Sequence, residues 1–154
     1  MKIRILCVGK SKQKFIEEGV QEYLKRISKF ISIRFEILPD VKLTKTNTIK
    51  IVKNKEAEII EKHLSAKDFT IALDENGSQF SSQEFSELIK KNICSKKIVF
   101  IIGGVYGLSE KILRKADLKL SFSKFTFTHQ MIRMILTEQI YRAFTIIQGK
   151  KYHY

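Results

Sequence analysis

The sequence predicts a single α/β domain with a mostly parallel sheet and helices on both of its faces. Apolar stretches of strand length alternate along the chain with amphipathic stretches of helix length, a pattern typical of parallel strand pairing. The chain of 154 residues fits one compact domain, and it contains no internal repeat and no linker. We therefore treat residues 1–154 as one domain.

In the first part of the chain the hydrophobic period distinguishes strand from helix. Residues 2–8 are nearly all apolar, which predicts a buried strand. Residues 31–37 alternate between apolar and polar, which predicts a strand with one solvent-facing side that ends at Pro39. Between these strands, the spacing of i, i+4, i+7 and i+8 predicts a helix with this apolar face: Ile16, Val20, Tyr23, Leu24 and Ile27.

The middle of the chain predicts a lysine-rich helix, a strand and another helix. The first helix covers residues 47–64, and a short buried strand follows at residues 69–73. Residues 74–77 read as a turn in which Gly77 supplies a positive φ. Ser81 and Glu84 form a capping box for the next helix, which buries Phe85, Leu88 and Ile89. In the lysine-rich helix we expect these residues to point inward: Ile49, Val52, Ile59 and Ile60.

The last third begins with an apolar strand at residues 98–102 that stops at a glycine-rich turn. Ser109 then opens a short helix, and a final strand alternates over residues 118–122. A long helix near residues 130–147 closes the fold.

The charge of the chain favours a polyanionic partner. Lysine and arginine number 29 against 16 acidic residues, a net charge of +13, and such an excess attracts nucleic acid. A lysine-rich genome or a need for solubility would explain the same excess. No basic amphipathic helix stands out, so we expect no membrane partner. We also expect no DNA partner. With no leader at its start and no long apolar segment, the chain is expected to be soluble and cytoplasmic.

The composition does not favour a metal centre. Cys7 and Cys94 lack partners at metal-ligand spacing and are interpreted as reduced core residues. The three histidines, His63, His129 and His153, are scattered along the sequence. We therefore expect no metal ion.

The glycine turn differs from the common nucleotide-binding loops. Gly103, Gly104 and Gly107 form G-G-x-x-G late in the chain, whereas the dinucleotide fingerprint G-x-G-x-x-G follows a first strand. Residues 9–11 after the first strand are too short for a phosphate-binding loop. Glycines without a Cβ let the backbone approach a flat ligand, although such a loop also serves simply to turn the chain.

A polar and aromatic strip follows the last strand. Its hydroxyl and amide groups suit the edge of an adenine and an amino-acid tail, and an exposed strand edge would look the same. The strip consists of Phe122, Ser123, Lys124, Phe125, Thr126 and Phe127.

The apolar residues on two sides of the last helix predict that it packs against a second surface besides the sheet. One face carries Ile132, Ile135, Leu136, Ile140, Ala143, Phe144 and Ile147, and the other carries Met131, Met134 and Tyr141 beside Glu138 and Arg142. A helix that is apolar on two sides favours a homodimer, or else burial on both sides within one chain. The tail after Gly149 is either a frayed terminus or an RNA contact in which aromatic residues stack on a base; its candidates are Lys150, Lys151, Tyr152 and His153.

Four segments of the sequence resemble the ribosomal RNA large-subunit methyltransferase H family, a group of SPOUT-class, α/β-knot enzymes. They are Ile101-Ile-Gly-Gly-Val-Tyr-Gly-Leu-Ser109, Leu120-Ser-Phe-Ser-Lys-Phe-Thr-Phe-Thr-His129, Ile135-Leu-Thr-Glu-Gln-Ile-Tyr-Arg-Ala-Phe144 and Tyr152-His153. The start of the chain and residues 73–77 also resemble the family, so the resemblance spans essentially the whole chain.

This resemblance implies a deep trefoil knot in the last third, a homodimer, and S-adenosylmethionine as methyl donor. It implies methylation of N3 of a pseudouridine in a 23S rRNA stem-loop of the assembled ribosome. Donor contacts are implied at Leu73, at Gly103 or Gly104, and at residues 122–127. RNA contact or catalysis is implied at His129, Arg142, Tyr152 and His153.

For the chemistry, we hypothesise that His153 is the base, with Arg142 stabilising the uracil anion and His129 as a second candidate. Two rival interpretations remain open. One is a knotted methyltransferase that acts on transfer RNA, and the other is a non-catalytic RNA-binding or ribosome-associated module.

Overall fold

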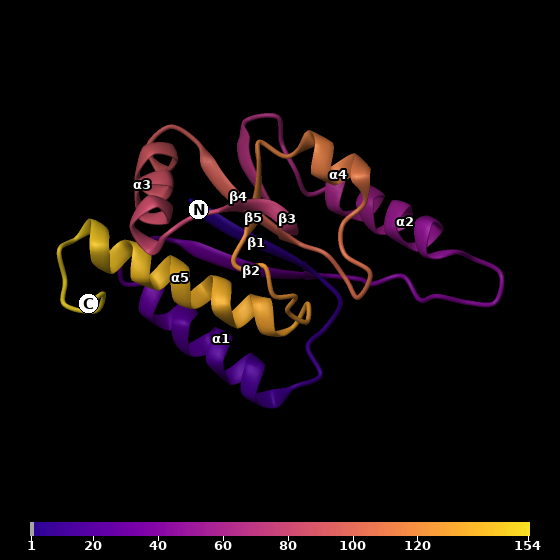
Figure 1. The fold of residues 1–154 in the computed structure, drawn as a ribbon, viewed down its shortest axis with the longest axis horizontal. Helices are drawn as coiled ribbons and strands as arrows, with labels where there is room; N and C mark the ends of the chain where they lie inside the picture. The colour runs from indigo at the N-terminus through magenta and orange to yellow at the C-terminus, as the bar shows by residue number, and fades with distance from the viewer. Residues whose placement is uncertain (1) are drawn as a thin grey trace.

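The computed structural model describes residues 2–154 and has a five-stranded parallel sheet at its centre (Figure 1). The strand order is β2-β1-β4-β3-β5, and all four pairings are parallel. This architecture confirms the predicted α/β class. In chain order the elements are β1 (Ile3–Val8), α1 (Lys14–Ile27), β2 (Ile33–Leu38), α2 (Ile49–Glu61), β3 (Asp68–Gln79), α3 (Ser82–Ile93), β4 (Lys97–Ile102), α4 (Glu110–Lys115), β5 (Leu118–Ser121) and α5 (Met131–Ile147).

Helices cover both faces of the sheet, as Figure 1 shows. Helices α1, α3 and α5 contribute to one hydrophobic core, and α2 and α4 contribute to the other. Strand β1 serves both cores, because Ile5 and Cys7 point into the first while Leu6 and Val8 point into the second. The central strands therefore read as continuous apolar runs rather than as alternating ones.

The turn predicted at residues 74–77 is wrong, because β3 continues through it to Gln79. The register against β5 shifts between Leu73 and Ser78, and Gly77 lacks the positive φ that was expected. A Cβ on Gly77 would lie 2.7 Å from the carbonyl carbon of Lys119. The glycine is thus explained by close backbone approach between two strands rather than by turn geometry.

Two expected core residues are exposed. Ile49 opens α2 beyond the edge of the core and remains 47% exposed. Cys94 is the C-cap of α3 and is also exposed, whereas Cys7 is buried as predicted. Burial raises the pKa of the Cys7 thiol to about 12, so this cysteine is not a nucleophile.

Helix α5 packs on both the sheet and α1. Leu136 and Ile140 are buried as expected. The outer residues Met134 and Tyr141 also find partners within the chain, since Met134 lies against Gly19 of α1 and the Tyr141 ring is 6.1 Å from that of Tyr23. For these two residues the structure therefore agrees with the alternative of burial on both sides within one chain.

Candidate functional site

A cavity of about 650 Å³ opens beside residues 73–76 of β3 and at the carboxyl ends of β4 and β5. Ligands of parallel α/β sheets bind at this edge, where the loops after neighbouring strands meet. Its walls come from the part of β3 where the register against β5 shifts, the glycine turn after β4 and the segment after β5. The lining residues include Leu73, Asp74, Glu75, Asn76, Gly103, Gly104, Val105, Tyr106, Gly107, Ser121, Phe122, Ser123, Phe125, Thr126, Phe127, Thr128, His129 and Ile132.

The glycine turn is a tightly closed loop. Gly104 and Gly107 form an isolated antiparallel bridge, and Gly107 has φ +76°. A Cβ on Gly103 would lie 2.7 Å from the carbonyl carbon of Gly107, and one on Gly104 would lie 3.1 Å from the carboxylate oxygens of Glu56. Gly103 has no room for a side chain and Gly104 has little, so the turn presents bare backbone to the cavity.

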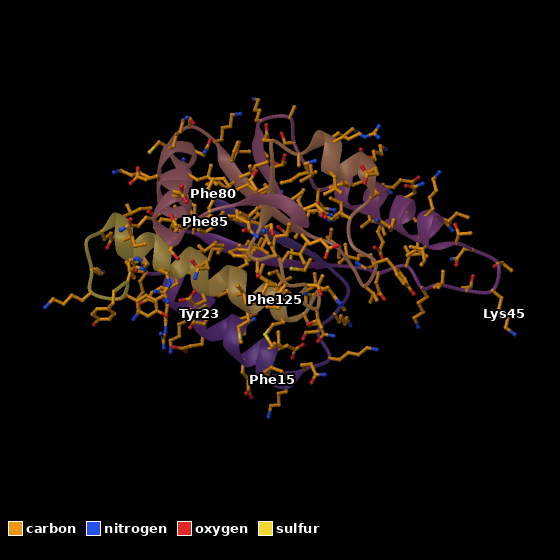
Figure 2. All side chains as sticks on the ribbon, viewed as in Figure 1. Phe15, Tyr23, Lys45, Phe80, Phe85 and Phe125 are labelled. Atoms are coloured by element: carbon orange, nitrogen blue, oxygen red, sulfur yellow. The ribbon has the colours of Figure 1, made fainter. Side chains whose placement is uncertain are left out.

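The segment after β5 forms the opposite wall. Phe122 packs edge-on against Phe85 of α3, which anchors the wall in the core. Phe125 is 81% exposed and lies near the start of α5 (Figure 2). Of the six residues predicted to contact a donor here, Lys124 does not line the cavity.

His129 lies at the cavity edge, just before α5, and a buried arginine holds its backbone. The Nε atom of Arg133 donates to the carbonyl oxygen of His129 at 3.0 Å. Its Nη2 atom donates to the carbonyl oxygens of Val8 at 2.8 Å and Gly9 at 2.9 Å. Partial burial, together with the charge of Arg133, lowers the pKa of His129. Its imidazole is therefore neutral at neutral pH and able to accept a proton.

The C-terminal tail contacts α5 through hydrogen bonds and ring contacts, so it is not a frayed terminus. Glu138 of α5 accepts two hydrogen bonds at these contacts. Arg142 Nη2 donates to Glu138 Oε1 at 2.5 Å, and the Tyr152 hydroxyl donates to the same oxygen at 3.2 Å. The guanidinium carbon of Arg142 lies 4.8 Å from the centre of the Tyr152 ring, and its Nη1 lies 3.4 Å from Nδ1 of His153. Hydrogen bonding to Glu138 raises the pKa of Arg142, while burial raises that of Tyr152. Lys150 lies above the Phe30 ring at 4.6 Å, and Lys151 is exposed.

The structure does not bring this C-terminal cluster to the cavity of its own chain. Arg142 and His153 are absent from the cavity lining, whereas His129 is part of it. Arg142 lies 13 residues after His129, and at 1.5 Å per residue a helix of that length separates them by roughly 20 Å. The predicted catalytic residues thus form two groups, one at each end of α5.

Sequence reasoning missed several polar residues around the cavity. Lys53 of α2 and Glu110 of α4 line it, as does Asp74. Glu56 and Arg133 are buried beside it although both are charged. Their spacing was the available signal: Glu56 lies on the apolar face of α2 with Val52 and Ile60, and Arg133 lies one turn before Leu136 on α5.

Among residues 2–154 no group of three or more histidine, cysteine, aspartate or glutamate side chains could hold a metal ion. Within the same range, no helix is both long and apolar enough to cross a membrane.

Comparison with known proteins places the chain in a family. A family model described as "Predicted SPOUT methyltransferase" matches residues 1–153. A protein named ribosomal RNA large subunit methyltransferase H from Christiangramia forsetii is 46% identical over 156 aligned residues, covering 100% of this chain and 99% of that protein. The chain belongs to the ribosomal RNA large subunit methyltransferase H family of SPOUT methyltransferases.

Other relatives agree with this assignment, and solved structures share the fold. Proteins of the same name from Flavobacterium johnsoniae and Bacteroides thetaiotaomicron are 45% and 42% identical, each covering 100% of this chain and 99% of the relative. A probable methylase family protein from Haemophilus influenzae has a similar structure, with a TM-score of 0.56 at 15% identity, covering 99% of this chain and 70% of that one. At this identity the likeness supports the fold alone.

Proposed function

We propose that the chain transfers a methyl group from S-adenosylmethionine to N3 of a pseudouridine in 23S rRNA of the assembled, cytoplasmic ribosome. One observation carries the proposal: the glycine turn and the strip at residues 122–127, which α4 and β5 separate in the sequence, form two walls of one cavity. Both belong to the segments that carry the resemblance to the family. Relatives named as ribosomal RNA methyltransferases match the chain along its full length.

The cavity fits the proposed donor. Its volume of about 650 Å³ lies in the usual range for sites that hold a cofactor-sized molecule. Gly103 and Gly104 offer bare backbone for an adenine edge, and Leu73 and Phe122 offer apolar surface. When bound, S-adenosylmethionine supplies an electrophilic methyl group whose transfer is an in-line displacement and needs chiefly alignment.

The residues of the chain would then handle the proton on uracil N3. Methylation removes this proton, so a base or a nearby cation favours the reaction. His129 stands at the cavity, and its lowered pKa keeps it in the proton-accepting form. His153 and Arg142 lie together at the other end of α5, and we assign them to base and anion stabilisation in the cavity of a second copy.

A homodimer follows from this assignment. The separation of roughly 20 Å between His129 and Arg142 along α5 prevents Arg142 and His153 from reaching the cavity of their own chain. A two-fold dimer would place them at the partner's cavity, together with Lys150, Lys151 and Tyr152 as RNA contacts. The trefoil knot that the resemblance implies for the last third of the chain belongs to the same proposal.

The test is methyl incorporation from labelled S-adenosylmethionine into unmethylated 70S ribosomes, free 23S rRNA and free tRNA. We expect incorporation into ribosomes at N3 of a pseudouridine. Incorporation into tRNA instead would favour the rival tRNA methyltransferase. Failure to bind S-adenosylmethionine at millimolar concentration in calorimetry would favour a non-catalytic RNA-binding module. Wild-type rates in His153→Ala would exclude His153 as the base.

A further inference from the structure

A strongly basic segment connects β2 to the middle of α2, and only Lys53 in it belongs to the cavity described above. Residues 41–55 contain five lysines and no aspartate or glutamate; we name this segment the basic arm. Its lysines are Lys42, Lys45, Lys50, Lys53 and Lys55. None of them takes part in the salt bridges found among residues 2–154. Unpaired lysines are available to a polyanionic partner.

The arm extends away from the body of the protein. Figure 1 shows the connection between β2 and α2 reaching beyond the sheet, and Figure 2 shows Lys45 at its tip. The side chain of Asn47 shapes the loop, because it accepts from the backbone N–H of Thr44 at 2.7 Å and donates to the carbonyl oxygen of Lys42 at 3.1 Å. The loop therefore presents its lysines from a hydrogen-bonded framework.

The arm is joined to the cavity at two points. Lys53 lines the cavity directly. Glu56, the buried carboxylate that follows the arm on α2, accepts a hydrogen bond from the backbone N–H of Val41 at 3.1 Å and packs against Gly104. The start of the arm and the glycine turn thus both contact the Glu56 side chain. A polyanion that lies along the arm would therefore reach the cavity at Lys53.

We propose that the basic arm binds the phosphate backbone of the rRNA flanking the target nucleotide, with Lys53 at the point where the RNA enters the cavity. The inference rests on the proposed function, since it concerns the RNA that supplies the methylated base. Continuity with the cavity favours RNA over a membrane, because Lys53 joins the arm to the cavity in which the proposed RNA base would react. Lysine contacts to phosphate give affinity that does not depend on the base sequence. This suits an RNA whose target base is recognised in the cavity.

The test compares two triple variants of equal net charge. Lys42→Ala/Lys45→Ala/Lys50→Ala removes the arm lysines outside the cavity, and Lys67→Ala/Lys90→Ala/Lys91→Ala removes three exposed lysines elsewhere. For the arm variant we expect the KM for unmethylated 70S ribosomes to rise at least about tenfold with kcat retained. We also expect the slope of log KM against log salt to fall by about 2–3, one unit per lost phosphate contact. Donor binding in calorimetry should match the wild type.

Two outcomes would overturn the proposal. One is a KM and salt slope equal to those of the control triple. The other is weaker ribosome binding with an unchanged salt slope and unchanged binding to extracted 23S rRNA, which would assign the arm to a protein contact. Filter binding of extracted 23S rRNA tests the arm even if the wild type methylates no ribosomes. Failure of the proposed function is therefore distinguishable from failure of this inference.

Discussion

Gly103 and Gly104 are neighbours in the cavity wall, yet the space around them differs. A Cβ on Gly103 would meet the backbone at Gly107, 2.7 Å away, while one on Gly104 would meet the end of the Glu56 side chain at 3.1 Å. Backbone cannot move aside as a carboxylate can. The two positions therefore differ in their tolerance of alanine.

We expect Gly103→Ala to lower the free energy of unfolding by about 1–3 kcal/mol through overpacking and to weaken S-adenosylmethionine binding. Gly104→Ala should cost clearly less, since Glu56 can shift. Urea unfolding and calorimetry of both variants check this, and equal losses at the two positions would contradict the backbone explanation.

The lowered pKa of His129 makes the stability of the protein depend on pH. Its pKa is lowered from 6.5, first by burial and then by the charge of Arg133. A histidine whose folded pKa lies below its unfolded one stabilises the fold fully above the unfolded value, and this contribution is lost as the pH falls through the folded value.

We therefore expect the free energy of unfolding of the wild type to fall as the pH drops below about 6.5, and to fall less steeply in His129→Gln. Urea unfolding at a series of pH values measures both slopes. His63→Gln serves as the control that removes a different histidine. A steeper slope in His129→Gln than in the wild type would reverse the sign of the shift.

At the scale of elements, the contact between α1 and α5 replaces part of the partner surface that the sequence suggested. Gly19 lies in the middle of α1, where a Cβ would collide with the thioether of Met134. A glycine inside a helix costs about 0.5–1 kcal/mol relative to alanine, so close packing explains its presence here.

A double-mutant cycle tests that packing. Gly19→Ala alone should destabilise the protein by about 1–3 kcal/mol. In a Met134→Ala background the same change should become neutral or stabilising, because the clash is gone and the helix propensity remains. Thermal unfolding of the four proteins gives the coupling, and additive effects would show that the two side chains do not meet.

At the scale of the whole molecule, the separation between the cavity and the Arg142–His153 pair requires two chains for the proposed active site. Two inactive variants should then complement each other. Leu73→Arg fills the cavity, and Arg142→Ala removes the cation from the other end of α5.

Co-expression of the two variants should restore roughly a quarter of wild-type activity, because half of the dimers are mixed and each has one intact composite site. Methyl incorporation into 70S ribosomes is the measurement, with each variant alone as the control. No recovery, with dimers confirmed by mass, would show that a site does not combine residues of two chains.

The order and type of the elements follow from the sequence by itself, as does the location of the cavity walls. Hydrophobic period, the capping box at Ser81 and the late glycine turn are local signals, and each depends on residues within a few positions of one another. They also carry the family resemblance, which the matching relatives confirm.

Only the tertiary structure decided which distant segments touch. Gly77 reads as a turn residue until Lys119 is placed against it. The spacing of Arg133 places it beside Leu136 on α5, but only the fold shows that the carbonyl groups of Val8 and Gly9 accept hydrogen bonds from its guanidinium. Tertiary packing also decides that Lys53 lies at the cavity and that His153 lies away from it. Close approach and burial depend on packing between residues far apart in the chain, and the local period of a sequence does not report that packing.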